Sequence, residues 1–168
     1  ALGFRGCSVS MPFKEDVIAL VDEMDMSASA IQSINTIVNT DGKLKAYNTD
    51  YGAIADLITS HALDCTSSII ILGSGGMAKA VGAAFRDAGF AAGTLVARNM
   101  ETGKSLASEL GYEWKPDVSG LAADIIVNVT PIGMSSSSAE SELAFPEATI
   151  RRANVVFDVV AFPSETPL

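Results

Sequence analysis

A glycine-rich turn directly follows a run of apolar residues near the middle of the chain, an arrangement suited to binding a pyrophosphate. The apolar run covers residues 68–72, and the turn reads Gly73, Ser74, Gly75, Gly76, Met77, Ala78. Gly73 permits a tight turn, Gly75 lets the backbone approach phosphate oxygens, and Ala78 is small enough for close packing of a helix on the strand. The positive end of that helix would face the phosphates. Glycine alone is weak evidence, but the flanking strand and helix patterns favour a dinucleotide site over a purely structural turn.

The end of the next predicted strand bears on the choice of dinucleotide. Residues 93–98 are predicted to form a strand, and the residues at its end are Arg98 and Asn99. An acidic residue at this position binds the ribose hydroxyls of NAD, whereas an arginine suits the 2′-phosphate of NADP. No acidic residue stands at this tip, and Lys104 follows on the next predicted helix. We therefore expect NADP, with a solvated arginine at a strand end as the structural alternative.

Three polar residues in the first third of the chain also suggest a site. Lys14 opens a predicted helix, where a cation is unfavourable because the helix dipole is positive at that end. Asn35 lies inside a predicted strand, and Asp50 stands at a helix entrance, where it could serve as an N-cap. Each has a structural explanation by itself. Their occurrence together beside a dinucleotide-binding pattern favours a functional role.

Composition and charge exclude several classes of protein. The chain has 168 residues, 48% of them hydrophobic, and a formal net charge of −9. That charge argues against nucleic-acid binding. Apolar runs are only of strand length, so no membrane span is predicted, and residues 1–6 do not resemble a signal peptide. Cys7 and Cys65 lack metal-ligand spacing, so we expect no metal site, reduced thiols and a cytoplasmic location.

The order of predicted elements indicates an α/β protein with a doubly wound parallel sheet and part of a smaller α/β domain. Strands are expected at residues 68–73, 93–98, 124–130 and 154–160, with helices at 76–88 and 100–110. The last two strands are almost continuously apolar, as in sheets covered on both faces. We place a nucleotide-binding domain at residues 63–168.

Residues 1–62 read as a separate, smaller unit. We expect a strand at residues 6–11, a helix from Lys14 with an apolar stripe at Val17, Leu20, Val21 and Met24, and a strand at residues 31–39. The last strand returns through a turn at Asp41 and Gly42. The patterns are already under way at residue 1 and stop soon after a strand, so we expect the chain to be part of a longer protein.

Six segments, in order, make the chain resemble the shikimate dehydrogenase family over essentially its whole length. They are residues 9–14 (VSMPFK), 34–36 (INT), 47–50 (YNTD), 73–78 (GSGGMA), 128–134 (NVTPIGM) and 158–168, which begins DVV and ends TPL. Six ordered matches are far more specific than the glycine loop alone.

The resemblance implies a function for each of these segments. It implies NADP-dependent interconversion of shikimate and 3-dehydroshikimate, in the pathway to chorismate and aromatic amino acids, with Lys14 and Asp50 as the acid–base pair. Ser10 and Asn35 would bind the substrate. Residues 1–62 would be the later part of the substrate-binding domain. The implied cofactor contacts are Gly73, Ser74, Gly75, Gly76, Met77, Ala78, Arg98, Asn99, Thr130 and Val159.

Some positions depart from the family pattern. Ala161 stands where typical members carry a substrate-contacting tyrosine, and Tyr51 replaces a common glycine. Loss of a phenol removes a hydrogen bond to substrate. We therefore interpret the chain as a divergent relative whose substrate is shikimate, quinate or an aminated analogue. An NAD-using quinate/shikimate dehydrogenase and a nucleotide-binding module without catalysis are the alternatives, and the residues do not decide between a monomer and a homodimer.

Overall fold

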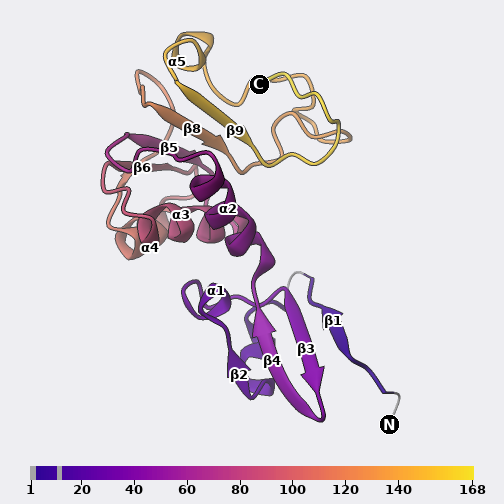
Figure 1. Ribbon diagram of the computed structural model, residues 1–168. Coiled ribbons are helices and arrows are strands. Elements are labelled where there is room, and N and C mark those ends of the chain that lie inside the picture. The colour runs from indigo at the N-terminus through magenta and orange to yellow at the C-terminus, as the bar shows by residue number, and fades with distance from the viewer. Residues whose placement is uncertain (1–2, 11–12) are drawn as a thin grey trace. The chain divides into compact units, whose positions relative to one another are not determined.

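The computed structural model describes residues 3–10 and 13–168 and shows two compact units, each built around its own sheet. The N-terminal unit is Ala1–Ala62 and the C-terminal unit is Leu63–Leu168. Both units are labelled by element in Figure 1. The functions assigned to them from the sequence remain predictions.

The N-terminal unit contains a four-stranded sheet in the order β1-β3-β4-β2. Strands β1 (Gly6–Ser8), β3 (Thr36–Thr40) and β4 (Lys43–Tyr47) are antiparallel, whereas β2 (Glu23–Met24) pairs in parallel with β4. The helical elements are the 3₁₀ helix η1 (Asp16–Leu20), α1 (Met26–Ser29) and the longer α2 (Thr49–Ser60). A small core is formed by Ala28, Ile34, Ile37 and Ala46.

The predicted hairpin is confirmed. Asp41 and Gly42 have φ angles of +52° and +93°, and Thr40 pairs with Lys43 across the turn. Positive φ at both central residues is the geometry of a type I′ turn, whose twist matches that of the flanking strands. The hairpin brings the start of β3 beside the end of β4.

The predicted helix from Lys14 to Met24 is wrong. Only the 3₁₀ helix η1 forms, Leu20 is 71% exposed, and Met24 lies in β2. Residues 22–24 pair with β4 instead of forming a helix. Asp22 N donates to Leu44 O, and Leu44 N donates to the Asp22 carboxylate. Val17, Val21 and Met24 still pack on the core, so three of the four residues of the predicted stripe are core residues, whereas Leu20 is not.

Two predicted strands of this unit are shorter than expected. The strand predicted at 31–39 begins only at Thr36, because residues 30–32 form a turn in which Gln32 has a φ of +49°. Ser33 N donates to Ala28 O, which folds this turn back on α1. The strand predicted at 6–11 ends at Ser8 among the described residues, and Met11 and Pro12 lie outside them.

The C-terminal unit confirms the predicted Rossmann-type α/β fold. Its five strands are all parallel, in the order β7-β6-β5-β8-β9. They are β5 (Ile69–Leu72), β6 (Gly93–Val96), β7 (Glu113–Lys115), β8 (Ile125–Asn128) and β9 (Val155–Asp158). Helices α3 (Gly76–Asp87) and α4 (Met100–Leu110) make the first two crossovers, and the short α5 (Glu147–Ile150) precedes β9.

Apolar side chains cover the faces of this sheet. In α3, Ala78, Val81 and Phe85 are buried, and Phe85 meets Phe90 edge to face with ring centres 4.9 Å apart. Elsewhere Ile70, Val96 and Ile126 form a cluster with Phe145, which precedes α5. This cluster is covered by short and irregular segments rather than by long helices, and the sequence did not predict α5 or the three-residue β7.

No helix in the described part of the chain is both long and apolar enough to cross a membrane.

Candidate functional site

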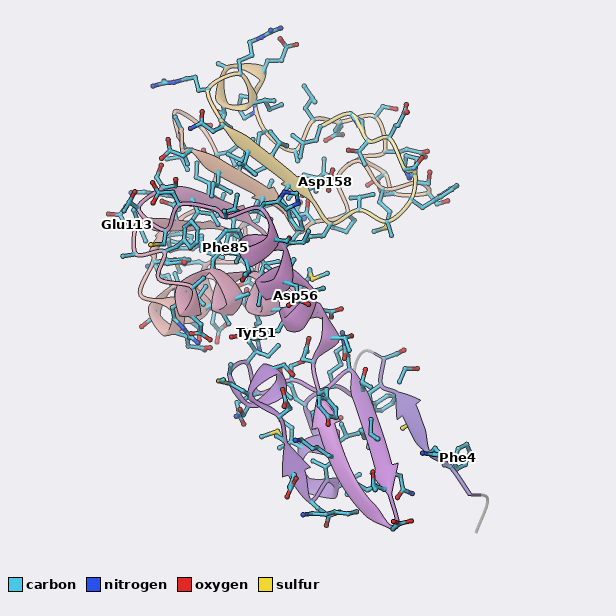
Figure 2. The ribbon with its side chains drawn as sticks, viewed as in Figure 1. Phe4, Tyr51, Asp56, Phe85, Glu113 and Asp158 are labelled. Atoms are coloured by element: carbon cyan, nitrogen blue, oxygen red, sulfur yellow. The ribbon has the colours of Figure 1, made fainter. Side chains whose placement is uncertain are left out.

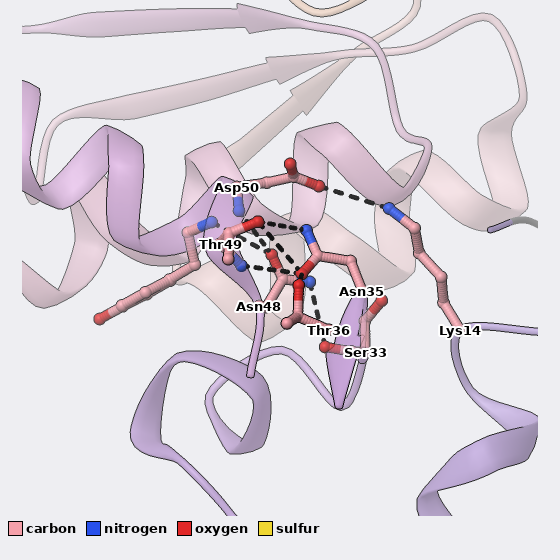
Figure 3. A network of polar contacts seen from close by, with 8 residues as sticks. Lys14, Ser33, Asn35, Thr36, Asn48, Thr49 and Asp50 are labelled. Atoms are coloured by element: carbon pink, nitrogen blue, oxygen red, sulfur yellow. Dashed lines mark hydrogen bonds and ion pairs between the residues drawn. The ribbon is translucent and has the colours of Figure 1, made fainter. Parts of the chain in front are cut away.

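An ion pair in the N-terminal unit joins two of the residues predicted to do chemistry. Lys14 Nζ lies 3.3 Å from Asp50 Oδ2, and the two side chains are 24% and 30% exposed (Figure 3). Main-chain contacts hold Lys14 near the start of β3, because its carbonyl accepts a hydrogen bond from Ile34 N. A partly exposed pair of this kind contributes only about 0.2–1 kcal/mol to stability. Its geometry is suited to charge stabilisation and proton transfer.

Asp50 is available for this pair because another residue caps α2. Asn48 Oδ1 accepts the N–H groups of Asp50 and Tyr51, which is the N-cap interaction. Asn48 is itself buried, and its Nδ2 donates to Ser33 O. The structural alternative in which Asp50 caps the helix is therefore wrong, since that role belongs to Asn48.

Asn35 is held rigidly beside the pair by two threonines. Its Oδ1 accepts from Thr49 N at 2.9 Å and from Thr36 Oγ1 at 2.9 Å, and its Nδ2 donates to Thr49 Oγ1 at 2.9 Å (Figure 3). These bonds tie the first turn of α2 to the start of β3. The carboxamide is therefore preorganised to present its second N–H to a ligand.

An open pocket of about 430 Å³ gathers these polar residues in the N-terminal unit. Its lining consists of Ser8, Val9, Ser10, Lys14, Asn35, Thr36 and Thr49. Hydroxyl, amide and ammonium groups thus converge on one volume, so the pocket suits a small ligand that carries several hydroxyls. The structure brings the predicted Ser10, Lys14 and Asn35 together here, with Asp50 bonded to Lys14.

The predicted phosphate-binding loop follows β5 in the C-terminal unit. Gly73 has a φ of +129°, which favours glycine, and a Cβ there would lie 2.8 Å from Val129 Cγ2. In contrast, a Cβ on Gly75 or Gly76 would meet nothing within 4 Å, so the surface of the loop is open. No side chain caps α3 at Gly75. The first N–H groups of α3 are therefore suited to donate to the phosphate oxygens of a dinucleotide.

The residues predicted to select NADP lie after β6. Arg98 is exposed there, and Asn99 caps α4 by accepting the N–H groups of Glu101 and Thr102 on its Oδ1. Ser74 Oγ lies 3.0 Å from Thr102 Oγ1, which joins the glycine loop to α4. Lys104 Nζ lies 5.1 Å from the centre of the Trp114 ring, an attractive cation–π contact that holds this ammonium group.

Thr130 and Val159 lie just beyond the ends of the neighbouring strands β8 and β9. Thr130 Oγ1 lies 2.6 Å from Asn128 Oδ1 and also accepts from Ile132 N, so its hydroxyl is engaged within the protein. Val159 N donates to Asn128 O. Thr130 N donates to Asn128 Oδ1 as well, so a contact of Thr130 with a cofactor would use its main-chain carbonyl.

Sequence reasoning missed the residues that hold the predicted ones. Thr36 and Thr49 fix Asn35, Asn48 frees Asp50, and Asn128 binds Thr130. Asn and Thr next to a strand or helix end are common as caps, so only their occurrence directly beside candidate residues could have indicated these roles.

Comparison with known proteins shows which proteins the chain resembles. A model described as the shikimate dehydrogenase substrate binding domain matches residues 1–37. The chain is 54% identical over 167 residues to a shikimate dehydrogenase-like protein of Haemophilus influenzae, covering 99% of this chain and 62% of that protein. The chain is thus similar to shikimate dehydrogenases and to a shikimate dehydrogenase-like protein.

Solved structures related to the shikimate dehydrogenase family share the fold of the chain. One is shikimate 5-dehydrogenase from Thermus thermophilus in complex with NADP(H) and shikimate, with a TM-score of 0.80 at 28% identity, covering 99% of this chain and 62% of that one. Another is quinate dehydrogenase from Corynebacterium glutamicum in complex with NAD, with a TM-score of 0.85 at 27% identity, covering 98% and 62%. The chain spans 62% of the length of these relatives.

Proposed function

We propose that this chain carries the acid–base pair, substrate pocket and nucleotide-binding loop of an NADP-dependent shikimate dehydrogenase. The reaction is the interconversion of shikimate and 3-dehydroshikimate. The observation that carries the proposal is the 3.3 Å ion pair of Lys14 and Asp50 beside the hydroxyl-lined pocket that contains Asn35. Similarity to the shikimate dehydrogenase-like protein of Haemophilus influenzae supports the reaction type.

The pocket residues would bind and orient the substrate. Shikimate carries several ring hydroxyls, and the second N–H of Asn35 and the hydroxyls of Ser10 and Thr49 offer hydrogen bonds to them. Ser10 and Asn35 are the residues assigned to substrate binding. Because Asn35 is fixed by Thr36 and Thr49, binding would need little reordering of its side chain.

Lys14 and Asp50 would move the proton. During oxidation the substrate hydroxyl transfers its proton to the pair, while the carbon loses a hydride and becomes a carbonyl. In the reverse direction the pair returns the proton to the alkoxide, and the ammonium of Lys14 stabilises its negative charge. The proton is assigned to the pair as a unit, because Lys14 Nζ donates a hydrogen bond to Asp50 Oδ2.

The glycine loop and the residues after β6, β8 and β9 would hold NADP, which when bound accepts or donates the hydride at C4 of its nicotinamide. The fit rests on the open surface over Gly75 and Gly76, the uncapped start of α3, and exposed Arg98 after β6. The residues proposed for this role are Gly73, Ser74, Gly75, Gly76, Met77, Ala78, Arg98, Asn99, Thr130 and Val159.

Oxidation of quinate with NAD is the second candidate function. It is favoured by the similarity to a quinate dehydrogenase in complex with NAD and by Ala161, which removes the phenol typical of shikimate dehydrogenases. Arg98 favours NADP, because a guanidinium pairs better with a phosphate than with a neutral ribose.

Initial rates and nucleotide binding together test the proposal. We expect oxidation of shikimate with NADP to be faster than oxidation of quinate, and NADP to bind more tightly than NAD. Faster turnover of quinate with NAD would support the second candidate. Binding of NADP without turnover of either substrate would indicate a nucleotide-binding module, and absence of nucleotide binding would contradict the proposal.

A further inference from the structure

A buried asparagine and an aspartate join the ends of β8 and β9 in the C-terminal unit. Asn128 is 0% exposed and stands in register with Asp158, which is labelled in Figure 2. Asn128 Nδ2 donates to Asp158 Oδ1 at 3.1 Å and to Ile132 O at 3.0 Å. A buried carboxamide is costly unless its hydrogen bonds are made, and here both ends of the amide are satisfied.

Asn128 also shapes the loop that follows its own strand. Its Oδ1 accepts from Thr130 N at 3.0 Å and from Thr130 Oγ1 at 2.6 Å. Thr130 Oγ1 in turn accepts from Ile132 N at 3.2 Å. These contacts fix the main chain of residues 129–132 against the end of β8.

Asp158 extends the same network to the segment after β9. Its Oδ1 accepts from Val160 N at 3.1 Å, and its Oδ2 accepts from Thr166 Oγ1 at 2.8 Å. The two loops then meet, because a Cβ on Gly133 would lie 3.3 Å from Pro167. One carboxylate thus holds the loop of β9 to the loop of β8.

The order of strands indicates what these two loops would do. The strands that follow β5 in the chain are added first on one side of it, as β6 and β7, and then on the other side, as β8 and β9. The glycine loop after β5 therefore lies at the point where the order of the strands reverses. A dinucleotide bound across such a switch point places one half over each side. Arg98 after β6 would bind the 2′-phosphate, which belongs to the adenosine half of NADP. The loops after β8 and β9, on the other side of β5, would therefore face the nicotinamide half.

We propose that Asn128 and Asp158 are positioning residues for the nicotinamide half of the dinucleotide. The inference rests on the proposed function, and it gives roles to two residues that need not touch the ligand. Asn128 would act through Thr130, whose N–H its Oδ1 accepts, and Asp158 would act on Val159 through the adjacent Val160, whose N–H its Oδ1 accepts. Loss of the network should therefore weaken binding of the whole dinucleotide without weakening binding of its adenosine half.

The test compares NADP with adenosine 2′,5′-bisphosphate, the half-ligand that lacks nicotinamide, by calorimetric titration. We expect Asp158→Ala to raise the Kd of NADP about tenfold, through loss of ordered contacts, and to leave the Kd of the half-ligand within about twofold. Asp158→Asn should remain close to wild type, because its carboxamide oxygen still accepts from Asn128 Nδ2. Thr166→Val removes a single bond from Asp158 and should show the same selectivity with a smaller effect, about threefold.

Asp124→Ala is the matched control. Asp124 forms a comparable polar clamp at the opposite end of β8, where its Oδ2 accepts from the N and the Oγ of Ser68, the residue before β5. It should lower stability without changing the ratio of the two Kd values. Equal weakening of both ligands by Asp158→Ala and Thr166→Val would mean a purely structural network, and no change in either would also overturn the inference. If the wild-type chain binds the half-ligand but NADP no more tightly, the inference alone fails; if it binds neither, the proposed function fails with it.

Discussion

Lys14 Nζ lies 3.3 Å from Asp50 Oδ2, although the two residues are 36 positions apart in the chain. The contact exists because Asn48 takes the capping role at α2 and leaves the carboxylate of Asp50 available. Lys14 also lines the open pocket that contains Asn35.

Lys14→Met should lower kcat far more than it raises KM. The variant keeps most of the side-chain volume but removes the ammonium group, so it loses charge stabilisation and proton transfer. We expect kcat for shikimate oxidation to fall by about 10²–10⁴-fold. Lys43→Met is the control, because Lys43 forms an exposed ion pair with Glu23. A variant with unchanged kcat would exclude Lys14 from the chemistry.

Asn35→Ala should act mainly on substrate binding. It removes the proposed hydrogen bond to a substrate hydroxyl and also releases Thr49 N at the start of α2. We expect KM for shikimate to rise about tenfold or more, in steady-state kinetics. Asn39→Ala, on the same strand, removes contacts to Phe4 O and Gly42 N and should leave KM near wild type. A similar KM in both variants would contradict the assignment of Asn35.

Arg98→Ala should change the preference between nucleotides. A charged hydrogen bond is worth about 1.5–3 kcal/mol, so the Kd of NADP should rise by roughly ten- to a hundredfold, while that of NAD stays constant. Lys104→Ala should have a smaller effect, because the Lys104 ammonium lies over the Trp114 ring. Titration of both nucleotides measures the preference, and an equal change for NAD and NADP would count against a role in binding the 2′-phosphate.

Two glycine substitutions should have opposite effects on stability. A Cβ on Gly93 would lie 2.3 Å from ring atoms of Tyr112, so Gly93→Ala should destabilise the protein by about 1–3 kcal/mol. Gly52 lies within α2, where a Cβ would meet nothing within 4 Å. Gly52→Ala should therefore stabilise by about 0.5–1 kcal/mol through helix propensity. Urea unfolding measures the change in the free energy of unfolding for both variants. A Gly93→Ala variant that is as stable as Gly52→Ala would show that the Tyr112 ring can move aside.

The stability of the protein should fall at high pH partly because of Tyr112. Burial raises the pKa of Tyr112 to about 12, and its hydroxyl donates to Phe90 O. Because the pKa in the unfolded chain is about 10, the contribution of Tyr112 is complete below pH 10 and is lost as pH rises through about 12. Tm measured from about pH 9 to 12 should fall more steeply for wild type than for Tyr112→Phe. Parallel curves would contradict a buried, neutral Tyr112.

Local patterns in the sequence determined much of the architecture. The patterns at 68–73 and 124–130 predict buried parallel strands, which form at Ile69–Leu72 and Ile125–Asn128. The glycines after the first of these strands predict its sharp exit into α3. The turn at Asp41 and Gly42 predicts the hairpin of the N-terminal unit. These features depend on the conformational preferences of a few consecutive residues, so a single sequence is sufficient to predict them.

Candidate site residues could be chosen from the sequence, but their contacts could not. The tertiary structure decided that Asn48 caps α2, that Asp50 pairs with Lys14, and that Thr36 and Thr49 hold Asn35. It also decided that residues 22–24 pair with β4 instead of continuing a helix. Hydrogen bonds between distant segments outweigh local propensity there, since a main-chain or polar side-chain group satisfies its bonding wherever the fold places a partner.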